Sequence, residues 1–189
     1  VAAIPISGSQ GGDAGAIVAD FVSEAFQDMG TNKLDEILGV SVVETRDSII
    51  PVVFNATINY STGILFISSS ETIDMTQASM IDLSKIFLSN STAELTMPLT
   101  GATIYETDGL IVTIGLTALQ RAAAIALSGT PGGDGGSLVF DVQAAALRDI
   151  AGNFNEDHFG LFLLEHQDII PPVIINAIID YNDGTLIVN

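Results

Sequence analysis

Hydrophobic and polar residues alternate with a period of two in the segment that begins at Pro51. Such alternation is typical of a β-strand with one buried face. The face expected to be buried carries Phe54, Ala56, Ile58 and Tyr60, and the opposite face carries Asn55, Thr57 and Asn59. The turn Ser61-Thr62-Gly63 then predicts a hairpin into a second strand over Ile64–Ser69, with glycine where a positive φ is needed.

Further segments with strand character follow along the chain. They are Lys85–Ser89, Ala102–Glu106, Leu110–Leu116, Ser137–Val142 and Phe159–Glu165. In the third of these, Leu110, Val112, Ile114 and Leu116 are expected to share one face. About seven short strands in roughly 120 residues is typical of an immunoglobulin-like domain. The sequence therefore predicts an all-β, immunoglobulin-like Greek-key sandwich.

Two short helices are expected to interrupt these strands. Thr117 can cap the N-terminus of an alanine-rich helix over Ala118–Leu127, which Ser128-Gly129 would close. A shorter helical turn is predicted over Gln143–Ile150, ending at Ala151-Gly152-Asn153.

The chain repeats itself with an offset of 121 residues and without a gap. Of the 68 positions that overlap at this offset, 26 are identical. The match defines the C-terminal part of one repeat over residues 1–46, a complete repeat over 47–167 and the first hairpin of a third over 168–189. A tandem array of this kind is the pattern of a repeat protein, so we expect a longer parent chain.

Composition excludes several functions. The chain has 189 residues, with Lys+Arg 5 and Asp+Glu 23, a formal net charge of -18, a hydrophobic content of 48% and Cys 0. Five cations cannot neutralise a run of phosphates, which argues against nucleic-acid binding. No apolar run reaches the ~18–20 residues that span a bilayer, so no membrane insertion is expected. The absence of cysteine excludes disulfides and thiolate sites.

Several short motifs carry a resemblance to a known family. They are Ser70-Glu71-Thr72-Ile73-Asp74, Ser84-Lys-Ile-Phe-Leu88, Ala146-Leu-Arg-Asp-Ile-Ala-Gly-Asn153 and Asp168-Ile-Ile-Pro-Pro172. In this order and over the whole 121-residue unit, the chain resembles the bacterial immunoglobulin-like (Big) repeats. The resemblance implies a β-sandwich in a long extracellular protein, such as an adhesin, a surface-layer component or a filament.

No catalytic centre is expected. His158 and His166 are the two histidines, and their counterparts 121 positions earlier are Ile37 and Thr45. There is no Gly-x-Ser-x-Gly elbow for a serine nucleophile. The glycine-rich loop over residues 129–136 lacks the Lys-Ser/Thr pair of a phosphate-binding loop, so we interpret it as a connector. No organic cofactor is expected either.

Clustered oxygen ligands make calcium the candidate metal. Glu71, Asp74, Asp149 and Asn153 could meet at one pole of the predicted sandwich. A second group lies at the junctions between repeats, around Asp47 and Asp168. A third, Asp180–Gly184, is better explained as a hairpin turn because its counterpart Asn59–Gly63 lacks most of the charge. Turn and capping roles would account equally well for Asp149 and Asn153.

Three asparagines, Asn55, Asn59 and Asn90, lie in Asn-x-Ser/Thr motifs, which are acceptors for glycosylation in a eukaryotic secretory route. The first two lie on the polar face of the opening strand.

Together these features predict a non-enzymatic structural repeat of a long secreted or cell-surface filament. Its partners would be the neighbouring repeats and, through segments that are apolar on both faces such as Phe159–Leu164, copies of itself in a fibre. The alternative is an adhesin-type binding module, stabilised by calcium, that recognises a glycan or a protein. Against that alternative, Trp is absent and Tyr105 is the one tyrosine not expected to point inward.

Overall fold

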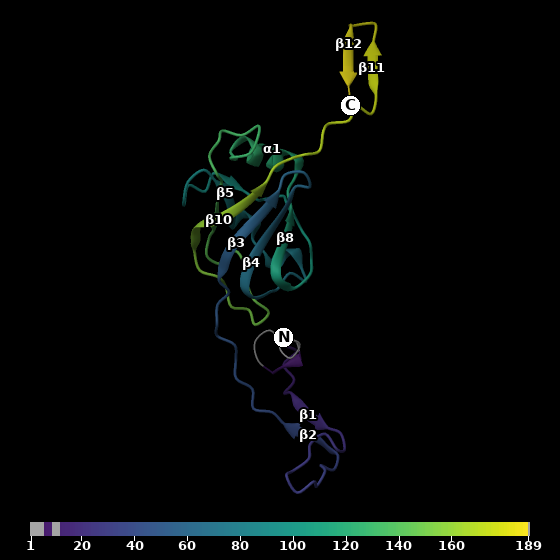
Figure 1. Ribbon diagram of the computed structural model, residues 1–189, viewed down its shortest axis with the longest axis vertical. Helices are drawn as coiled ribbons and strands as arrows, with labels where there is room; N and C mark the ends of the chain where they lie inside the picture. Colours follow the sequence, from purple (N-terminus) through teal and green to yellow (C-terminus); the bar gives the residue numbers. More distant parts are fainter. Residues whose placement is uncertain (1–5, 9–11, 189) are drawn as a thin grey trace.

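The computed structural model describes residues 6–8 and 12–188 and consists mainly of β-strands (Figure 1). Near the N-terminus β1 (Val18–Phe21) pairs with β2 (Ile37–Ser41), and near the C-terminus β11 (Ala177–Asp180) pairs with β12 (Thr185–Val188). Between them lies an eight-stranded sheet. Its strands are β3 (Val53–Asn59), β4 (Ile64–Ile73), β5 (Ile86–Ser89), β6 (Met97–Pro98), β7 (Thr103–Ile104), β8 (Gly109–Gly115), β9 (Val139–Val142) and β10 (His158–His166). The predicted all-β class is confirmed.

The large sheet has the order β6-β5-β9-β10-β3-β4-β8-β7. All neighbours are antiparallel except β10 and β3, which run parallel from the pair Leu163–Ala56 to the pair His166–Asn59. The two edge strands β6 and β7 are joined by residues 99–102 alone. Because so short a connection cannot span a flat eight-stranded sheet, the sheet curls back on itself.

The inner face of the curled sheet forms one hydrophobic core. Side chains from both halves of the sheet contribute to it, including Tyr60, Leu65, Ile114, Leu88 and Phe140, all of which have an exposed fraction of 0%. The hydrophobic effect that drives folding of the repeat therefore depends on strands from one end of the sheet meeting strands from the other.

The alternation predicted for the first strand holds for Ala56, Ile58 and Tyr60 but fails at Phe54, which is 55% exposed. The register between β3 and β4 shifts between Val53 and Asn55, so Val53 becomes the buried residue. A bulge of this kind moves side chains to the opposite face of a strand.

A similar shift affects β8. The register between β4 and β8 is irregular at the start of β8, and Leu110 is 54% exposed although Val112 and Ile114 are fully buried. The prediction that Leu110 shares their buried face is therefore wrong, because the sequence pattern does not reveal the irregularity.

Of the two predicted helices, only the first forms. Helix α1 (Ala118–Ala126) begins at a capping box in which the Thr117 hydroxyl accepts from the Gln120 N–H and the Gln120 side chain bonds back to the Thr117 backbone. Short 3₁₀ turns lie at Ala78–Met80 and Leu83–Lys85. In the described part of the chain, no helix is long and apolar enough to cross a bilayer.

The helix predicted over Gln143–Ile150 is wrong. Ala145 has a φ of 57°, which breaks a right-handed helix. The Asn155 side chain instead organises this segment, because its Oδ1 accepts from the Leu147 N–H at 2.7 Å and its Nδ2 donates to the Gln143 carbonyl at 3.0 Å. Hydrogen bonds from a distant asparagine thus replace the i→i−4 ladder.

The 121-residue offset applies to the backbone pairing as well as to the sequence. In β1–β2, Val18 pairs with Ser41, and in β9–β10 Val139 pairs with Phe162, with a register shift at equivalent positions in both pairs. In β11–β12 and β3–β4 the offset holds for all four residue pairs from Ala177–Val188 to Asp180–Thr185. The two small sheets therefore reproduce two adjacent strand pairs of the large one.

The two small sheets differ from their counterparts in burial. Tyr60 is fully buried in the large sheet, whereas Tyr181, its counterpart beside β11, is 87% exposed. The inward orientation predicted for Tyr181 is therefore not seen in this chain. The difference arises because no other strand of the chain covers the inner face of β11 and β12 among the described residues.

Candidate functional site

Three carboxylates meet at the end of the large sheet where the chain enters β3. One oxygen from each of Asp47, Glu71 and Asp149 lies within 4.8 Å of the others. We call these three residues, together with Asn153, the entry pole. They adjoin a cavity of about 270 Å³ lined also by Ser70, Thr72, Leu110, Ile150 and Ala151.

Each carboxylate reaches the entry pole from a different segment. Asp47 precedes β3, Glu71 lies near the end of β4, and Asp149 follows β9. Asp149 is 2% exposed, and its two carboxylate oxygens accept hydrogen bonds from the Asn153 backbone at 2.8 Å and the Asn153 Nδ2 at 2.9 Å. An isolated β-bridge between Ile73 and Asp149 ties the turn to β4.

The electrostatics of the entry pole favour a proton or a cation. Burial raises the pKa of Glu71 above its usual range, and the nearby carboxylates of Asp47 and Asp149 raise it further. Like charges at this spacing disfavour simultaneous ionisation. Oxygen ligands from three carboxylates match what a hard divalent cation such as calcium prefers.

The residues predicted for a calcium site are only partly brought together. Glu71 and Asp149 meet as expected, but Asp74 is bound elsewhere, by an ion pair of 2.6 Å with Arg148. The Asn153 Nδ2 donates to the Asp47 carbonyl at 3.5 Å and the Ile49 carbonyl at 3.2 Å, so Asn153 holds the entering chain.

Asp47 joins this cluster, although the sequence placed it in a separate group at the junction between repeats. The signal that could have united the two groups is the recurrence of Asp47 and Ile49 as Asp168 and Ile170. In both copies the N–H of the isoleucine donates to the aspartate carboxylate, at 3.0 Å and 2.9 Å. An Asx turn that recurs in both copies indicates that the backbone at Asp47 has a fixed conformation where it passes the turn at Asp149–Asn153.

The third group considered for a metal, Asp180–Gly184, forms the hairpin turn between β11 and β12. The Asp180 carboxylate accepts from the Asn182 N–H at 2.8 Å, and the Asp183 carboxylate from the Thr185 N–H at 2.9 Å. Hydrogen bonding from Thr185 lowers the pKa of Asp183. These bonds are those of a turn, as the sequence indicates.

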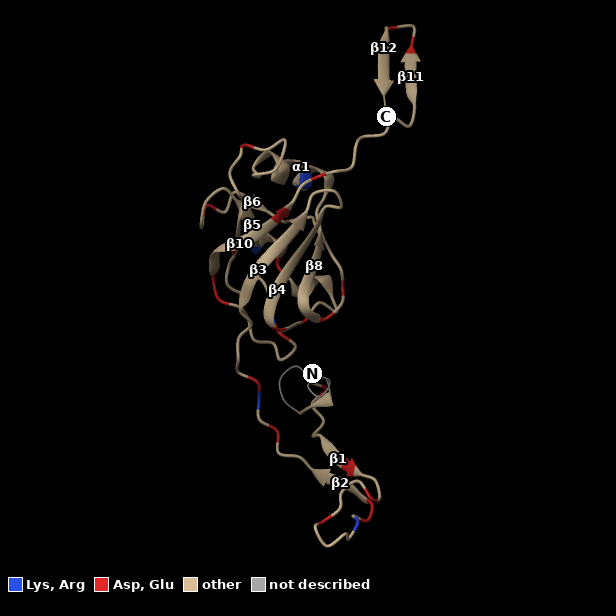
Figure 2. Ribbon diagram, in the orientation of Figure 1, with Lys and Arg blue, Asp and Glu red and all other residues tan. Residues whose placement is uncertain are grey.

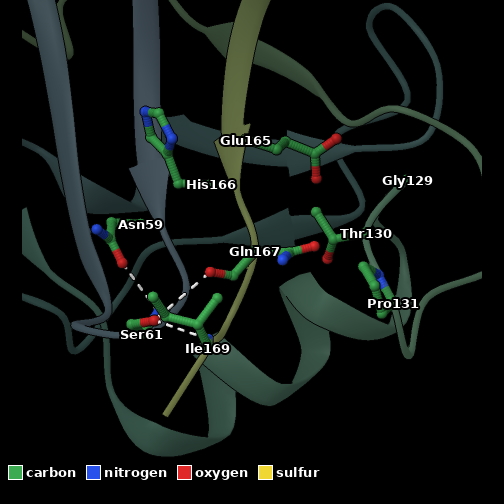
Figure 3. Close-up of a pocket in the computed structure, with 9 residues that line it drawn as sticks. All are labelled: Asn59, Ser61, Gly129, Thr130, Pro131, Glu165, His166, Gln167 and Ile169. Carbon is green, nitrogen blue, oxygen red and sulfur yellow. Dashed lines mark hydrogen bonds between the residues drawn. The ribbon is translucent and has the colours of Figure 1, made fainter.

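The opposite end of the large sheet, where β10 leaves it, contains a hollow of about 610 Å³ (Figure 3). We call this end the exit pole. Its lining comprises Asn59, Ser61, Gly129, Thr130, Pro131, Glu165, His166, Gln167 and Ile169. Figure 1 places α1 and the departing chain at this end, away from β1 and β2.

Hydrogen bonds at the exit pole fix both the hairpin and the departing chain. The buried Tyr60 hydroxyl donates to Glu165 at 2.6 Å, and desolvation together with this bond raises the pKa of Tyr60. The Ser61 hydroxyl accepts from the Ile169 N–H at 3.0 Å and donates to the Gln167 carbonyl at 3.5 Å. Figure 3 shows both contacts as dashed lines.

The three sequon asparagines lie in different environments. Asn55 is exposed on β3. The Asn59 Oδ1 accepts from the Ser61 and Thr62 N–H groups, and the Asn90 Nδ2 donates to Asp134 at 3.2 Å. Asn55 therefore offers the most accessible amide for a glycan.

The two histidines have different surroundings. The buried Nε2 of His158 has no hydrogen-bond partner among the described residues, and His166 is the exposed last residue of β10 and lines the exit-pole hollow. Neither forms a hydrogen bond with a serine or carboxylate that would activate a nucleophile in the described part of the chain.

Comparisons of the chain with family models, with curated proteins and with solved structures gave no match.

Proposed function

We propose that this chain is a segment of a tandem array of immunoglobulin-like domains that serves as a structural, non-enzymatic part of a long secreted or cell-surface filament. In this proposal residues 47–167 are one complete repeat, residues 1–46 the end of the repeat before it, and residues 168–189 the start of the next. The observation that carries the proposal is the strand register of β1–β2 and β11–β12, which matches that of β9–β10 and β3–β4 at an offset of 121.

The exposure of the small sheets supports this division. Ile178, Ile179 and Tyr181 are 57%, 48% and 87% exposed in a two-stranded hairpin. Two-stranded hairpins are marginal in water and need a further layer to cover their apolar face. In the complete repeat the strands that pair with β3 and β4 on either side are β10 and β8. The equivalent strands of a following repeat would bury the hairpin.

The strand order supports an immunoglobulin-like topology. In chain order β3, β4, β5, β6, β7, β8, β9 and β10 correspond to strands A, B, C, C′, D, E, F and G of such a domain. The neighbours A-B-E-D and C′-C-F-G then form the two layers, and parallel pairing of A with G joins them. We interpret this order as that of a Greek-key sandwich. It also agrees with the resemblance to bacterial immunoglobulin-like repeats.

The same topology suits a load-bearing role. The chain enters at β3 and leaves from β10, and these two strands are parallel neighbours. Tension along the chain therefore loads their hydrogen bonds in shear, including the bond of 2.9 Å from the Tyr60 N–H to the His166 carbonyl. Under this load, several hydrogen bonds between the two strands must break at the same time before the domain extends.

Lateral packing of copies would use the outer face of the same sheet. Phe66, Phe162 and Leu164 are 42%, 69% and 44% exposed there, and Leu164, Thr57 and Phe66 form one row across β10, β3 and β4. Figure 2 shows the Asp and Glu residues mainly in loops, which leaves most of the length of these strands uncharged. An uncharged face with exposed apolar side chains on β10 and β4 allows contact between copies that otherwise repel each other. Solution scattering that detects only separate, flexible units at high concentration would exclude this packing.

The array is tested by completing the third repeat. Residues 69–167 are appended after Asn189, which aligns with Ser68 in the repeat. We expect the amide hydrogens of Ile179 and Tyr181 to exchange at least a hundredfold more slowly in the extended chain, because their strand gains neighbours. A variant with the appended residues in scrambled order is the control. Unchanged exchange at Ile179 and Tyr181 would refute the array.

The alternative function, an adhesin-type module that binds a glycan or protein, is favoured by one observation. Tyr105 is 50% exposed and lines an open hollow of about 540 Å³ beside β8, with Thr107, Asp108, Leu110 and Thr113 among its neighbours. Exposed aromatic rings are platforms for sugar and protein contacts. Screening the chain and its Tyr105→Ala variant against a glycan array tests this alternative, which requires a ligand that only the unaltered chain binds.

A further inference from the structure

The complete repeat contacts a linker at each of its poles. The exit pole binds the linker that follows the repeat, and the entry pole binds the corresponding part of the linker that precedes it. At the exit pole, the hydroxyl of Ser61 accepts from the Ile169 N–H at 3.0 Å and lies 3.5 Å from the Gln167 carbonyl, to which it donates. At the entry pole, the Asn153 Nδ2 donates one hydrogen to the Asp149 carboxylate at 2.9 Å and shares the other between the Ile49 carbonyl at 3.2 Å and the Asp47 carbonyl at 3.5 Å.

The 121-residue offset places these contacts on one linker. Asp47 and Ile49 correspond to Asp168 and Ile170. In an array, the carbonyl of Asp168 would therefore bind the next repeat's equivalent of Asn153, while the N–H of Ile169 binds Ser61. This carbonyl and this N–H belong to the same peptide unit, which is planar and has no rotatable bond between them.

We propose that one peptide unit of each linker, that between Asp168 and Ile169 in this chain, is hydrogen-bonded by both of the repeats that it joins. The partner that the exit pole fits is thus the entry pole of the next repeat, and the junction is a rigid joint with no hinge residue. The inference rests on the proposed array and adds to it the way in which consecutive repeats are fixed to each other.

The linker itself is stiff on either side of this peptide unit. The Asp168 carboxylate accepts from the Ile170 N–H at 2.9 Å, and Asp47 does the same for Ile49 at 3.0 Å. Two prolines, Pro171 and Pro172, follow directly. Proline fixes its own φ and restricts the residue before it, so residues 170–172 have little freedom to bend.

The two side chains that form the joint are either identical or chemically similar in the neighbouring copy. Asn153 aligns with Asn32, which makes the same pair of bonds to Asp28, at 2.9 Å for both the backbone N–H and the Nδ2. Ser61 aligns with Asn182. A serine hydroxyl and an asparagine amide each provide one acceptor oxygen and at least one donor, so either can hold an N–H and a carbonyl together.

The exit-pole half of the joint can be tested in the 189-residue chain. We expect Ser61→Ala to speed hydrogen exchange at the Ile169 amide at least tenfold, and Ser61→Asn, the residue of the next copy, to restore most of the protection. Thr130→Ala is the matched control, because Thr130 lines the same hollow and bonds to Ser128 rather than to the linker. Equal exchange at Ile169 in the unaltered chain, Ser61→Ala and Thr130→Ala would overturn the proposal.

The complete joint is tested in the chain extended by residues 69–167. Because the chain has Cys 0, cysteines placed at Leu119, which is 85% exposed, and at its equivalent in the appended repeat carry the only two spin labels. We expect a narrow distance distribution that broadens at least twofold when Ser61 and the appended equivalent of Asn153 are both changed to alanine. A distribution as broad in the unaltered chain overturns the rigid joint, and so does a narrow one that the double variant leaves unchanged. If the Ile179 and Tyr181 amides also stay unprotected, the array itself fails.

Discussion

The backbone N–H of Gly160 donates a hydrogen bond of 2.7 Å to the Asp141 carboxylate, and 121 positions earlier Gly39 donates one of 2.7 Å to Asp20. Both glycines have a positive φ, 69° and 72°, and both lie at the register shift of their strand pair. In the complete repeat Asp141 is fully buried and also accepts from the Ala93 N–H at 3.1 Å. A buried carboxylate thus fixes the bulge in β10.

Asp141→Asn should destabilise the complete repeat by roughly 3 kcal/mol, because an amide NH₂ would face a backbone N–H donor and leave it unsatisfied. Asp157→Asn is the control, since the Asp157 carboxylate accepts from the Ala144 N–H at 2.7 Å in an exposed position. There we expect a loss below about 1 kcal/mol. Urea unfolding of both variants measures the difference, and equal losses would contradict a structural role for the buried carboxylate.

Gly160→Ala should destabilise the repeat by more than backbone strain alone. An alanine at positive φ costs about 1–2 kcal/mol. A Cβ at Gly160 would in addition lie 2.6 Å from the Thr92 hydroxyl oxygen and 2.9 Å from its methyl carbon. Gly101 has a φ of 88° with nothing within 4 Å of the same Cβ, so Gly101→Ala reports the strain alone. If thermal unfolding gives the same loss for both variants, the contact with Thr92 has no energetic weight.

Much of the fold can be predicted from the sequence because each strand of a half-buried sheet shows an alternation of apolar and polar residues within its own segment. Ala56, Ile58 and Tyr60 alternate with polar residues, and their burial follows from that alternation. Phe54 does not follow it, since the bulge between β3 and β4 depends on how two strands pair and leaves no local mark. The edge strand β6 (Met97–Pro98) was not predicted, because two residues are too few for a period.

The candidate site is less accessible to sequence reasoning because it joins segments that are distant in the chain. Asp47 and Asp149 are 102 positions apart and meet only when the turn after β9 folds onto the entering chain. Arg148 removes Asp74 from the predicted cluster through an ion pair that no spacing rule indicates. The repeat offset was the one sequence signal that reaches across such distances, since it marks positions whose hydrogen bonds recur.

His158→Ile should stabilise the complete repeat. The Nε2 of His158 is buried and has no hydrogen-bond partner among the described residues, and the residue at the equivalent position of the preceding copy is Ile37. Replacing an unsatisfied buried polar atom by an apolar side chain should raise the free energy of unfolding by about 1 kcal/mol. His166→Thr, which introduces the preceding copy's Thr45 at an exposed position, should change it by less than about 0.5 kcal/mol. A loss of stability in His158→Ile would mean that the ring packs better than the shorter side chain.

Calcium should stabilise the repeat at neutral pH and have little effect at acidic pH. Burial first, and then the Asp47 and Asp149 carboxylates, raise the pKa of Glu71 in the folded state. Since the folded state then holds its proton more tightly than the unfolded state, the stability from this group is present below the unfolded pKa. It is lost as pH rises through the folded pKa. A divalent cation at the entry pole would replace the lost proton, contributing about 2.7 kcal/mol at a calcium concentration one hundred times Kd.

Glu71→Gln separates the proton from the metal in this prediction. Without calcium at pH 7, the variant should be more stable than the unaltered chain, because one of three mutually repelling carboxylates is neutral, and the difference should vanish below the unfolded pKa of glutamate. Its melting temperature should not respond to calcium. Asp74→Asn breaks the ion pair with Arg148 and should lower stability at every calcium concentration while keeping the calcium response. Thermal unfolding of the unaltered chain and of both variants, each with calcium and with a chelator at pH 4 and pH 7, measures these effects on stability and on the calcium response. If Glu71→Gln and the unaltered chain respond equally to calcium, then calcium does not bind at the entry pole.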